Sequence, residues 1–227
     1  MSDGLIIDQL KRNQILDLLK EGKRVDGREF DESRQLTIDL NVVPKAEGSA
    51  RARLGDTEVV AGVKIQPERP FPDTGDKGML ICTAEILPIA HPSAETGPPT
   101  PDVVELARVT DRGIRESGML DMKQLVLEKD KSVIGIFCDN AVTDHDGNLF
   151  DACSYASTAA INSCKIPKYE MQDDAPVKLE DQFTEPPVTT LPVSVTMAKI
   201  GQYILVDPTI DEWSIICLLY TSPSPRD

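Results

Sequence analysis

The chain has 227 residues, of which 40% are hydrophobic, and this length and composition suit one large or two small globular domains. Its 38 acidic and 24 basic residues give a formal charge of -14, which argues against a protein that coats nucleic acid over its whole surface. The sequence has neither the ~20 consecutive apolar residues of a membrane span nor the features of a signal peptide at its start. We therefore expect a soluble, cytoplasmic protein in which any contact with a polyanion is confined to a focused patch.

Cysteine and histidine are sparse in this sequence. The five cysteines form no Cys-x-x-Cys pair, and the two histidines, His91 and His145, are not at the spacing of a metal-ligand pair. We expect no zinc site, and reduced thiols are the usual state inside the cell. Cys153 and Cys164 fall in a segment rich in small residues, so we interpret them as core residues and not as nucleophiles.

The first half of the chain predicts one helix followed by strands. Residues 5–21 carry apolar side chains at helical spacing and are followed by Gly22, a typical helix stop. The expected buried face of this helix consists of Ile6, Leu10, Ile15, Leu18 and Leu19. Alternating apolar and polar residues predict half-buried strands at 36–42, 49–54, 57–65 and 79–87. Gly55-Asp56 predicts a hairpin turn between the second and third of these strands.

The second half begins with a proline-rich irregular segment, residues 88–101. Thr100 as N-cap and Pro101 at the first helical position then predict the start of a helix. Beyond it we expect strands at 124–127 and 132–143, a turn at 144–148, a small-residue helix at 149–164, an acidic loop at 170–187, and strands at 193–199 and 202–206. This order predicts an α/β domain with a mixed sheet covered by helices.

Three arginines form a basic row on this acidic chain. Arg108, Arg112 and Arg115 are spaced i, i+4 and i+7, so an α-helix places their guanidinium groups on one face. Such a row indicates a local anionic partner, above all a chain of phosphates. The alternative is a solvated helix face on which the arginines pair with Glu105, Asp111 and Glu116.

The last residues, 217–227, do not continue the preceding pattern. Cys-Leu-Leu-Tyr-Thr-Ser-Pro-Ser-Pro-Arg-Asp corresponds to a transposon-type sequencing adapter translated in frame. We expect this tail to be an artefact and the natural sequence to stop near Ile216, which leaves the fold incomplete at its C-terminus. The alternative is a genuine linker rich in Ser and Pro.

Several collinear segments resemble the RNase PH-like subunits of the archaeal exosome, over nearly all of residues 5–216. They are Gly22-Lys-Arg-Val-Asp-Gly-Arg28, Ala46-Glu-Gly-Ser-Ala50, Leu54-Gly-Asp-Thr57, Glu105-Leu-Ala-Arg-Val-Thr-Asp-Arg112, Asp144-His-Asp-Gly-Asn-Leu-Phe-Asp-Ala-Cys153 and Val206-Asp-Pro-Thr-Ile-Asp-Glu212. The likeness is greater to the non-catalytic member than to its catalytic sister. It implies a fold like the second domain of ribosomal protein S5, here an N-terminal helix (1–22) and a C-terminally truncated RNase PH-like domain (23–216).

The resemblance also implies partners. Members form a hetero-hexameric ring in which catalytic and non-catalytic subunits alternate around a channel, RNA-binding cap proteins join the ring, and RNA is degraded from its 3′ end. Inorganic phosphate is the attacking group at the catalytic sister's site, so this chain is expected to need no cofactor of its own. Arg108 and Arg112 match positions that reach RNA phosphates near the partner's active site. Arg115 lies on the same face, nearer the helix end, where it can instead offset the helix dipole.

The phosphate-binding turn of the family is altered in this sequence. Catalytic relatives have a Gly-Ser/Thr-Arg turn at the start of the small-residue helix, where the arginine and the helix N-terminus hold the phosphate. The corresponding residues here are Gly147, Asn148 and Leu149. Because leucine offers neither a hydrogen-bond donor nor a charge, we predict that this turn is degenerate and binds phosphate poorly.

Several acidic residues lie close to the expected end of the natural sequence. The family's catalytic aspartate would lie further along than Asp207, inside the tail, so the sequence does not show it. Asp207, Asp211 and Glu212 could suggest a metal cluster, but we interpret them as the loop after the last natural strand.

Three hypotheses remain open from the sequence. The first is a non-catalytic ring subunit that completes a composite phosphorolytic site and contacts RNA. The second is a phosphorolytic exoribonuclease in its own right, which Leu149 disfavours. The third is an S5-like binding module unrelated to RNA decay, which the arginine row and the collinear motifs disfavour.

Overall fold

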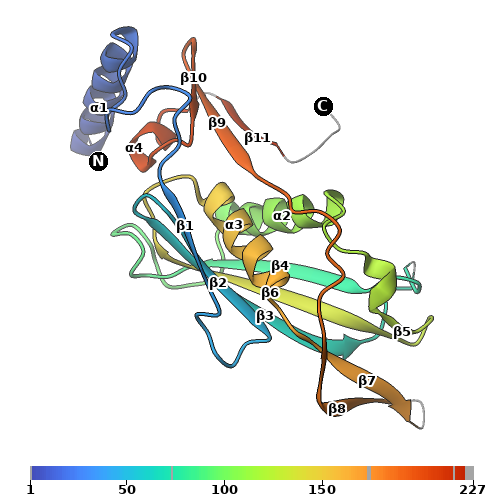
Figure 1. Ribbon diagram of the computed structural model, residues 1–227. Coiled ribbons are helices and arrows are strands. Elements are labelled where there is room, and N and C mark those ends of the chain that lie inside the picture. Colours follow the sequence, from blue (N-terminus) through green and yellow to red (C-terminus); the bar gives the residue numbers. More distant parts are fainter. Residues whose placement is uncertain (1, 73, 173–174, 217, 223–227) are drawn as a thin grey trace.

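The computed structural model describes residues 2–72, 74–172, 175–216 and 218–222. Its elements, in chain order, are α1 (Ser2–Lys20), β1 (Leu36–Leu40), β2 (Gly48–Leu54), β3 (Thr57–Glu68), β4 (Met79–Ile86), α2 (Pro101–Glu116), the 3-10 helix η1 (Met122–Leu125), β5 (Val126–Glu128), β6 (Ser132–Asp144), α3 (Leu149–Asn162), β7 (Ile166–Gln172), β8 (Ala175–Thr184), β9 (Val195–Ile200), β10 (Tyr203–Val206), α4 (Ile210–Trp213) and β11 (Leu218–Ser222). Helices α2 and α3 lie over one face of the large sheet (Figure 1). The expected mixed sheet covered by helices is confirmed.

The large sheet has the strand order β1-β2-β3-β6-β4, with β5 also paired to β6. Only the β4–β6 pair is parallel among these described strands; the others are antiparallel. Parallel neighbours need a crossover connection, and α2 supplies it by running between β4 and β6. The connection brings the start of α2 close to the start of α3, where the candidate site lies (Figure 1).

The main core forms between the sheet and α3 because their facing residues are small or branched. Alternate residues of β3, such as Val59 and Val63, are 0–1% exposed, and Ala156 and Ala160 of α3 are fully buried. The helix approaches β2 so closely that a Cβ at Gly48 would lie 2.4 Å from the Ala160 carbonyl oxygen. Only glycine fits at that position.

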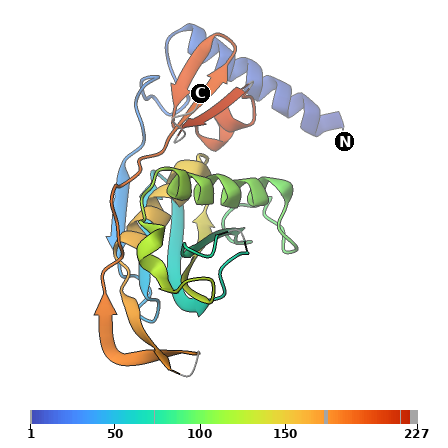
Figure 2. The same ribbon diagram turned by 90° about the vertical axis from the view of Figure 1, so that its right-hand side faces the viewer.

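A second, smaller core joins the two ends of the chain. Its buried residues are Ile15, Leu19, Ile200, Leu205 and Ile215, from α1, the β10-β9-β11 sheet and the end of α4. Figure 2 shows α1 beside this small sheet, away from the main core. The division into residues 1–22 and 23–216 stays a prediction.

The predicted burial of α1 and β1 is wrong in part. Leu10, expected on the buried face of α1, is 64% exposed, whereas the described side chains of Ile15 and Leu19 are buried as expected. All five residues of β1 are exposed. β1 is an edge strand, and its apolar residues therefore extend beyond the cover that the helices provide.

Two predicted segments differ from the structure. The expected acidic loop 170–187 is largely a hairpin, because β8 pairs with β7 and the two project from the end opposite α1 (Figure 2). Most residues of β8 are exposed, and in β7 exposed residues alternate with half-buried ones after Pro167, so the acidic composition of the segment did not exclude strands. The expected strand 124–127 begins as η1 and becomes β5 only at Val126.

The tail contributes a strand to the small sheet. Residues 218–222 form β11, antiparallel to β9, while residues 217 and 223–227 lie outside the described part. The adapter origin of 217–227 stays a prediction.

Candidate nucleic-acid interface and phosphate turn

Helix α2 begins where the sequence predicts. Thr100 has the extended backbone of an N-cap and Pro101 follows inside the first turn, although the Thr100 side chain makes no capping hydrogen bond. Val103, Leu106 and Ile114 are buried against the core, which fixes the face that α2 presents outward.

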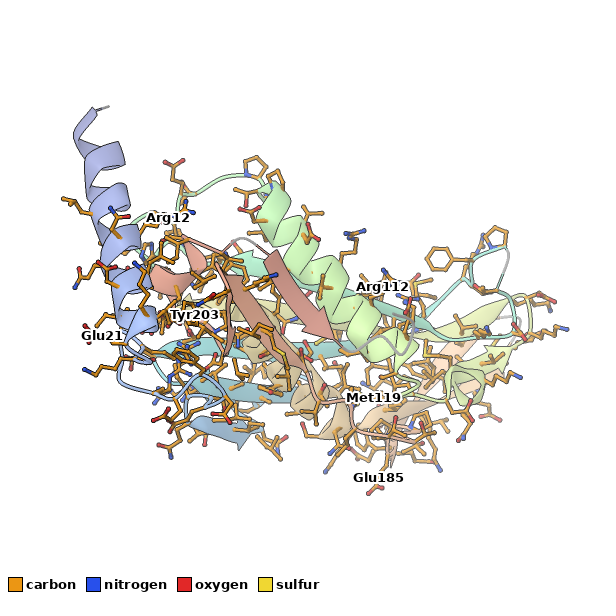
Figure 3. The ribbon with its side chains drawn as sticks, turned by 90° about the horizontal axis from the view of Figure 1, so that it is seen from above. Arg12, Glu21, Arg112, Met119, Glu185 and Tyr203 are labelled. Atoms are coloured by element: carbon orange, nitrogen blue, oxygen red, sulfur yellow. The ribbon has the colours of Figure 1, made fainter. Side chains whose placement is uncertain are left out.

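Arg108 and Arg112 lie on the exposed side of α2. Their side chains are 68% and 61% exposed, and each pairs with an acid of the same helix: Arg108 with Glu105 at 3.3 Å and Arg112 with Glu116 at 2.8 Å. Figure 3 shows Arg112 on α2. Exposed pairs of this kind contribute about 0–1 kcal/mol to stability. A contact of Arg108 and Arg112 with RNA stays a prediction.

Arg115 is held differently from the other two arginines. Its Nη2 donates to the Leu80 carbonyl oxygen at 2.6 Å and to Asp111, and Asp111 Oδ1 accepts from the Cys82 backbone N–H at 3.3 Å. Leu80 and Cys82 belong to β4, the edge of the sheet. The Arg115–Asp111 pair therefore satisfies backbone groups that an edge strand leaves unpaired. A role for Arg115 in binding RNA stays a prediction.

The turn before α3 is built by Gly147 and Asn148. Gly147 has φ +93°, and a Cβ there would lie 2.5 Å from the Thr209 carbonyl carbon, so no larger residue fits. Asn148 is the N-cap, with φ 46°, and its Nδ2 donates to Asp151 Oδ2 at 2.8 Å and to Asp207 Oδ1 at 2.7 Å. The Asn148 side chain is thus fully engaged within the protein.

Leu149 faces a cavity of about 970 Å³ at the starts of α2 and α3. The apolar part of the lining includes Ile86, Leu106, Phe150 and Trp213. Its acidic part consists of Glu85, Glu95, Asp102 and Glu105, and no lysine or arginine is among the described residues that line it. Asn148 and Leu149 thus line a cavity whose charged side chains are carboxylates, and weak binding of phosphate at this turn stays a prediction.

The sequence pattern did not predict the ion-pair network that lies behind the turn. Asp207, 1% exposed, accepts from Arg34 Nη2 at 2.9 Å and from Arg28 Nη1 at 3.0 Å, in addition to Asn148. Burial alone would raise the pKa of the Asp207 carboxyl, but the hydrogen bonds from Arg34 and Asn148 outweigh it and hold that pKa below its ordinary value. No spacing marks Arg34 as its partner, since the two residues are far apart in the chain.

A second buried pair joins the two chain ends. Arg24 Nη2 lies 2.7 Å from Glu212 Oε2, and both side chains are 0% exposed. Glu212 also forms a capping box with Thr209 at the start of α4. Asp26 accepts from the Arg28 backbone N–H at 3.2 Å and so closes the turn that follows Arg24.

The remaining acid of this segment, Asp211, is about half exposed and pairs with Lys11 at 3.2 Å. Asp207 and Glu212 have arginine partners instead. Among the residues the structure describes, no group of three or more His, Cys, Asp or Glu is placed to hold a metal ion.

The thiols of α3 and the residues after it are buried, as expected. Cys153 is 0% exposed and Cys164 is 2% exposed. Burial raises the pKa of Cys164 to about 12 and that of Cys153 further. Both thiols therefore stay protonated and act as small core residues.

Two family models match this chain. The model described as the 3′ exoribonuclease family, domain 1, matches residues 32–167, and that for domain 2 matches residues 190–216. The chain belongs to the 3′ exoribonuclease, or RNase PH, family. The resemblance seen in the sequence is therefore confirmed.

Within the RNase PH family, the similar relatives are exosome components. The chain is 46% identical over 210 residues to "Exosome complex component Rrp42" of Methanocella arvoryzae, covering 92% of this chain and 78% of that protein. It is 45% identical over 229 residues to the protein of the same name from Archaeoglobus fulgidus, covering 100% of this chain and 85% of that protein.

Solved structures give the same family assignment. The Archaeoglobus fulgidus exosome with RNA bound to the active site contains a chain with a TM-score of 0.85 and 42% identity, covering 96% of this chain and 88% of that one. A chain of an archaeal exosome core gives a TM-score of 0.80 at 40% identity, covering 96% and 86%. The RNase PH fold is confirmed. None of the described helices is long and apolar enough to cross a membrane.

Proposed function

We propose that this chain is the non-catalytic, Rrp42-type RNase PH subunit of an archaeal exosome core, which degrades RNA from its 3′ end. The observation that carries the proposal is Leu149 at the start of α3, at the position where the catalytic pattern requires arginine. The cavity that Leu149 faces is lined by carboxylates, and the neighbouring Asn148 amide is already bound to Asp151 and Asp207. Among the described residues that line the cavity, there is no lysine or arginine to hold a phosphate nucleophile.

The alternative of an autonomous phosphorolytic exoribonuclease needs a phosphate site within this chain. Arg34 contacts the turn, with Nη2 3.4 Å from the Gly147 carbonyl oxygen. It is already held by Asp207 and Asp146. An S5-like module unrelated to RNA decay is disfavoured by sequence identities of 40–47% to exosome chains.

The composite-site role requires partners on the surface of this chain. We place it in a hetero-hexameric ring with a catalytic sister subunit, joined by RNA-binding cap proteins, in the cytoplasm. The exposed apolar residues of edge strand β1 support a contact with another subunit: Leu36, Ile38 and Leu40 are 39%, 43% and 51% exposed. A row of this kind is unusual on a surface that faces only water. Phosphate is used at the sister's site, so this chain holds no cofactor.

In the ring, Arg108 and Arg112 contact RNA phosphates near the sister's active site, with Arg115 at the end of the row. We expect Arg108→Ala or Arg112→Ala to weaken RNA binding by the assembled ring by about 1–3 kcal/mol, the usual effect of losing a charged hydrogen-bond partner. Fluorescence anisotropy with single-stranded RNA measures this effect. The difference should shrink as salt rises, because the release of a counterion into more concentrated salt contributes less free energy.

Arg12→Ala is the matched control for this experiment. Arg12 is an exposed arginine on α1, at the end of the view opposite Arg112 in Figure 3, and its removal changes the net charge equally. The assigned contact would be refuted if both α2 variants bound RNA at low salt as tightly as the unmodified ring. It would also be refuted if Arg12→Ala reduced the RNA affinity equally.

A further inference from the structure

The cavity beside Leu149 lies at the N-terminal ends of two helices. Thr100 and Asp102 at the start of α2, and Asn148 and Leu149 at the start of α3, all line it. The two helices have 16 and 14 residues, long enough for each to place a partial positive charge at its N-terminus. Geometry of this kind usually attracts an anion.

The carboxylate side chains that line the cavity make it unfavourable for an anion. Each helix end is equivalent to roughly half a positive charge, so the two offset about one of the cavity's four carboxylates. The four come from three separate elements: Glu85 from β4, Glu95 from the proline-rich segment, and Asp102 and Glu105 from α2. A phosphate entering the cavity would therefore meet a net negative field.

Among the described residues, the nearby positive groups do not compensate for Glu85, Glu95 and Asp102. Arg34 is bound by Asp207 and Asp146, and Arg108 pairs with Glu105. His145 lines the cavity, but burial, then His91, then Arg34 lower its pKa, which favours the neutral imidazole.

We infer that Glu85, Glu95 and Asp102 are specificity-determining residues, which repel the phosphates of the RNA 3′ end from this subunit's own cavity and so leave the sister's site as its only destination. This inference rests on the proposed function. Repulsion by these carboxylates is a separate effect from the replacement of the family's arginine by Leu149. The replacement only removes an attraction for phosphate, whereas the carboxylates add a repulsion. Glu105 is left out of the test because removing it would also release Arg108.

The test uses a ring assembled from this chain and a catalytically inactive sister, with an oligoadenylate carrying a photoreactive nucleotide at its 3′ end. With the unmodified chain, crosslinks should form on the sister. The variant Glu85→Gln/Glu95→Gln/Asp102→Asn should increase crosslinks to this chain roughly tenfold at low salt, since removal of like charges of this kind changes affinity by a kilocalorie or more. The increase should fall at high salt, because the carboxylates are exposed and therefore screened.

The matched control is Glu170→Gln/Glu180→Gln/Asp181→Asn on the β7–β8 hairpin, which changes the net charge equally, far from the cavity. Three results would overturn the inference: no increase in the cavity variant, an equal increase in the control, or crosslinks already abundant on the unmodified chain. Size-exclusion chromatography of the same samples reports ring assembly separately. Failure of the proposed function would appear there as a chain that does not join the sister, whatever the crosslinking pattern.

Discussion

Glu212→Ala is expected to lower the free energy of unfolding by about 3–5 kcal/mol, because it leaves the Arg24 guanidinium buried without its carboxylate partner. The Arg24–Glu212 pair joins the turn after α1 to α4, so its loss should also loosen the contact between the two chain ends. Urea denaturation followed by circular dichroism measures the change.

Asp211→Ala provides the comparison from the same short helix. Asp211 also forms an ion pair, with Lys11, but that pair is about half exposed, and its loss should cost no more than about 1 kcal/mol. The double variant Arg24→Met/Glu212→Leu should recover much of the lost stability, because it removes both buried charges together. If Glu212→Ala and Asp211→Ala lowered the free energy of unfolding equally, the buried pair would not contribute more to stability than the half-exposed pair, contrary to our prediction.

Asp207→Ala is expected to reduce stability by about 2–4 kcal/mol at pH 7, because Arg34, Arg28 and Asn148 all lose the same buried acceptor. The expected loss is smaller than for an isolated buried pair, since Arg34 keeps Asp146 and Arg28 keeps Asp26. Chemical denaturation at several pH values measures both the size of the effect and its pH dependence.

The pH dependence has a definite sign. The folded pKa of Asp207 lies below its ordinary value, so this carboxylate stabilises the fold above about pH 4 and loses that contribution as pH falls through the folded pKa. The difference in unfolding free energy between the original chain and Asp207→Ala should therefore become smaller as the pH falls. Asp146→Ala is the control, because Asp146 pairs with the same arginine. Burial raises the pKa of Asp146, so this substitution should lower the free energy of unfolding less than Asp207→Ala does. A difference that stayed constant down to pH 2 would contradict this account of Asp207.

The sequence predicts elements whose pattern is local. The start of α2 at Thr100-Pro101 and the turn at Gly147–Leu149 depend on neighbouring residues, and both lie where expected. The fold as a whole followed from the family resemblance, since several topologies fit the same order of helices and strands.

What could not be predicted depends on contacts between distant residues. Arg34 and Asp207 meet only because the loop before β1 and the loop after β10 converge behind the phosphate turn. The β7–β8 hairpin was missed because the acidic residues of this segment favoured a loop, whereas in the structure they occupy exposed strand positions. Likewise, Leu10 has the right spacing to be buried, but its side chain is 64% exposed because none of the described elements covers it.

For the arginine row, the structure shows the pairs expected of a solvated helix face: Arg108 with Glu105 and Arg112 with Glu116. Binding of RNA by these arginines stays a prediction. Arg115 is anchored to the backbone of β4, a contact that only the structure reveals.

The central claim is that this chain is the non-catalytic half of a composite phosphorolytic site. Its most direct test is the phosphate-dependent release of nucleoside diphosphates from RNA, measured with the chain alone, the catalytic sister alone, and the two combined. We predict no activity from this chain alone and greater activity from the combination than from the sister alone. Phosphorolysis by this chain alone would contradict the account, because Leu149 and the carboxylates around it would then have to support a phosphate site.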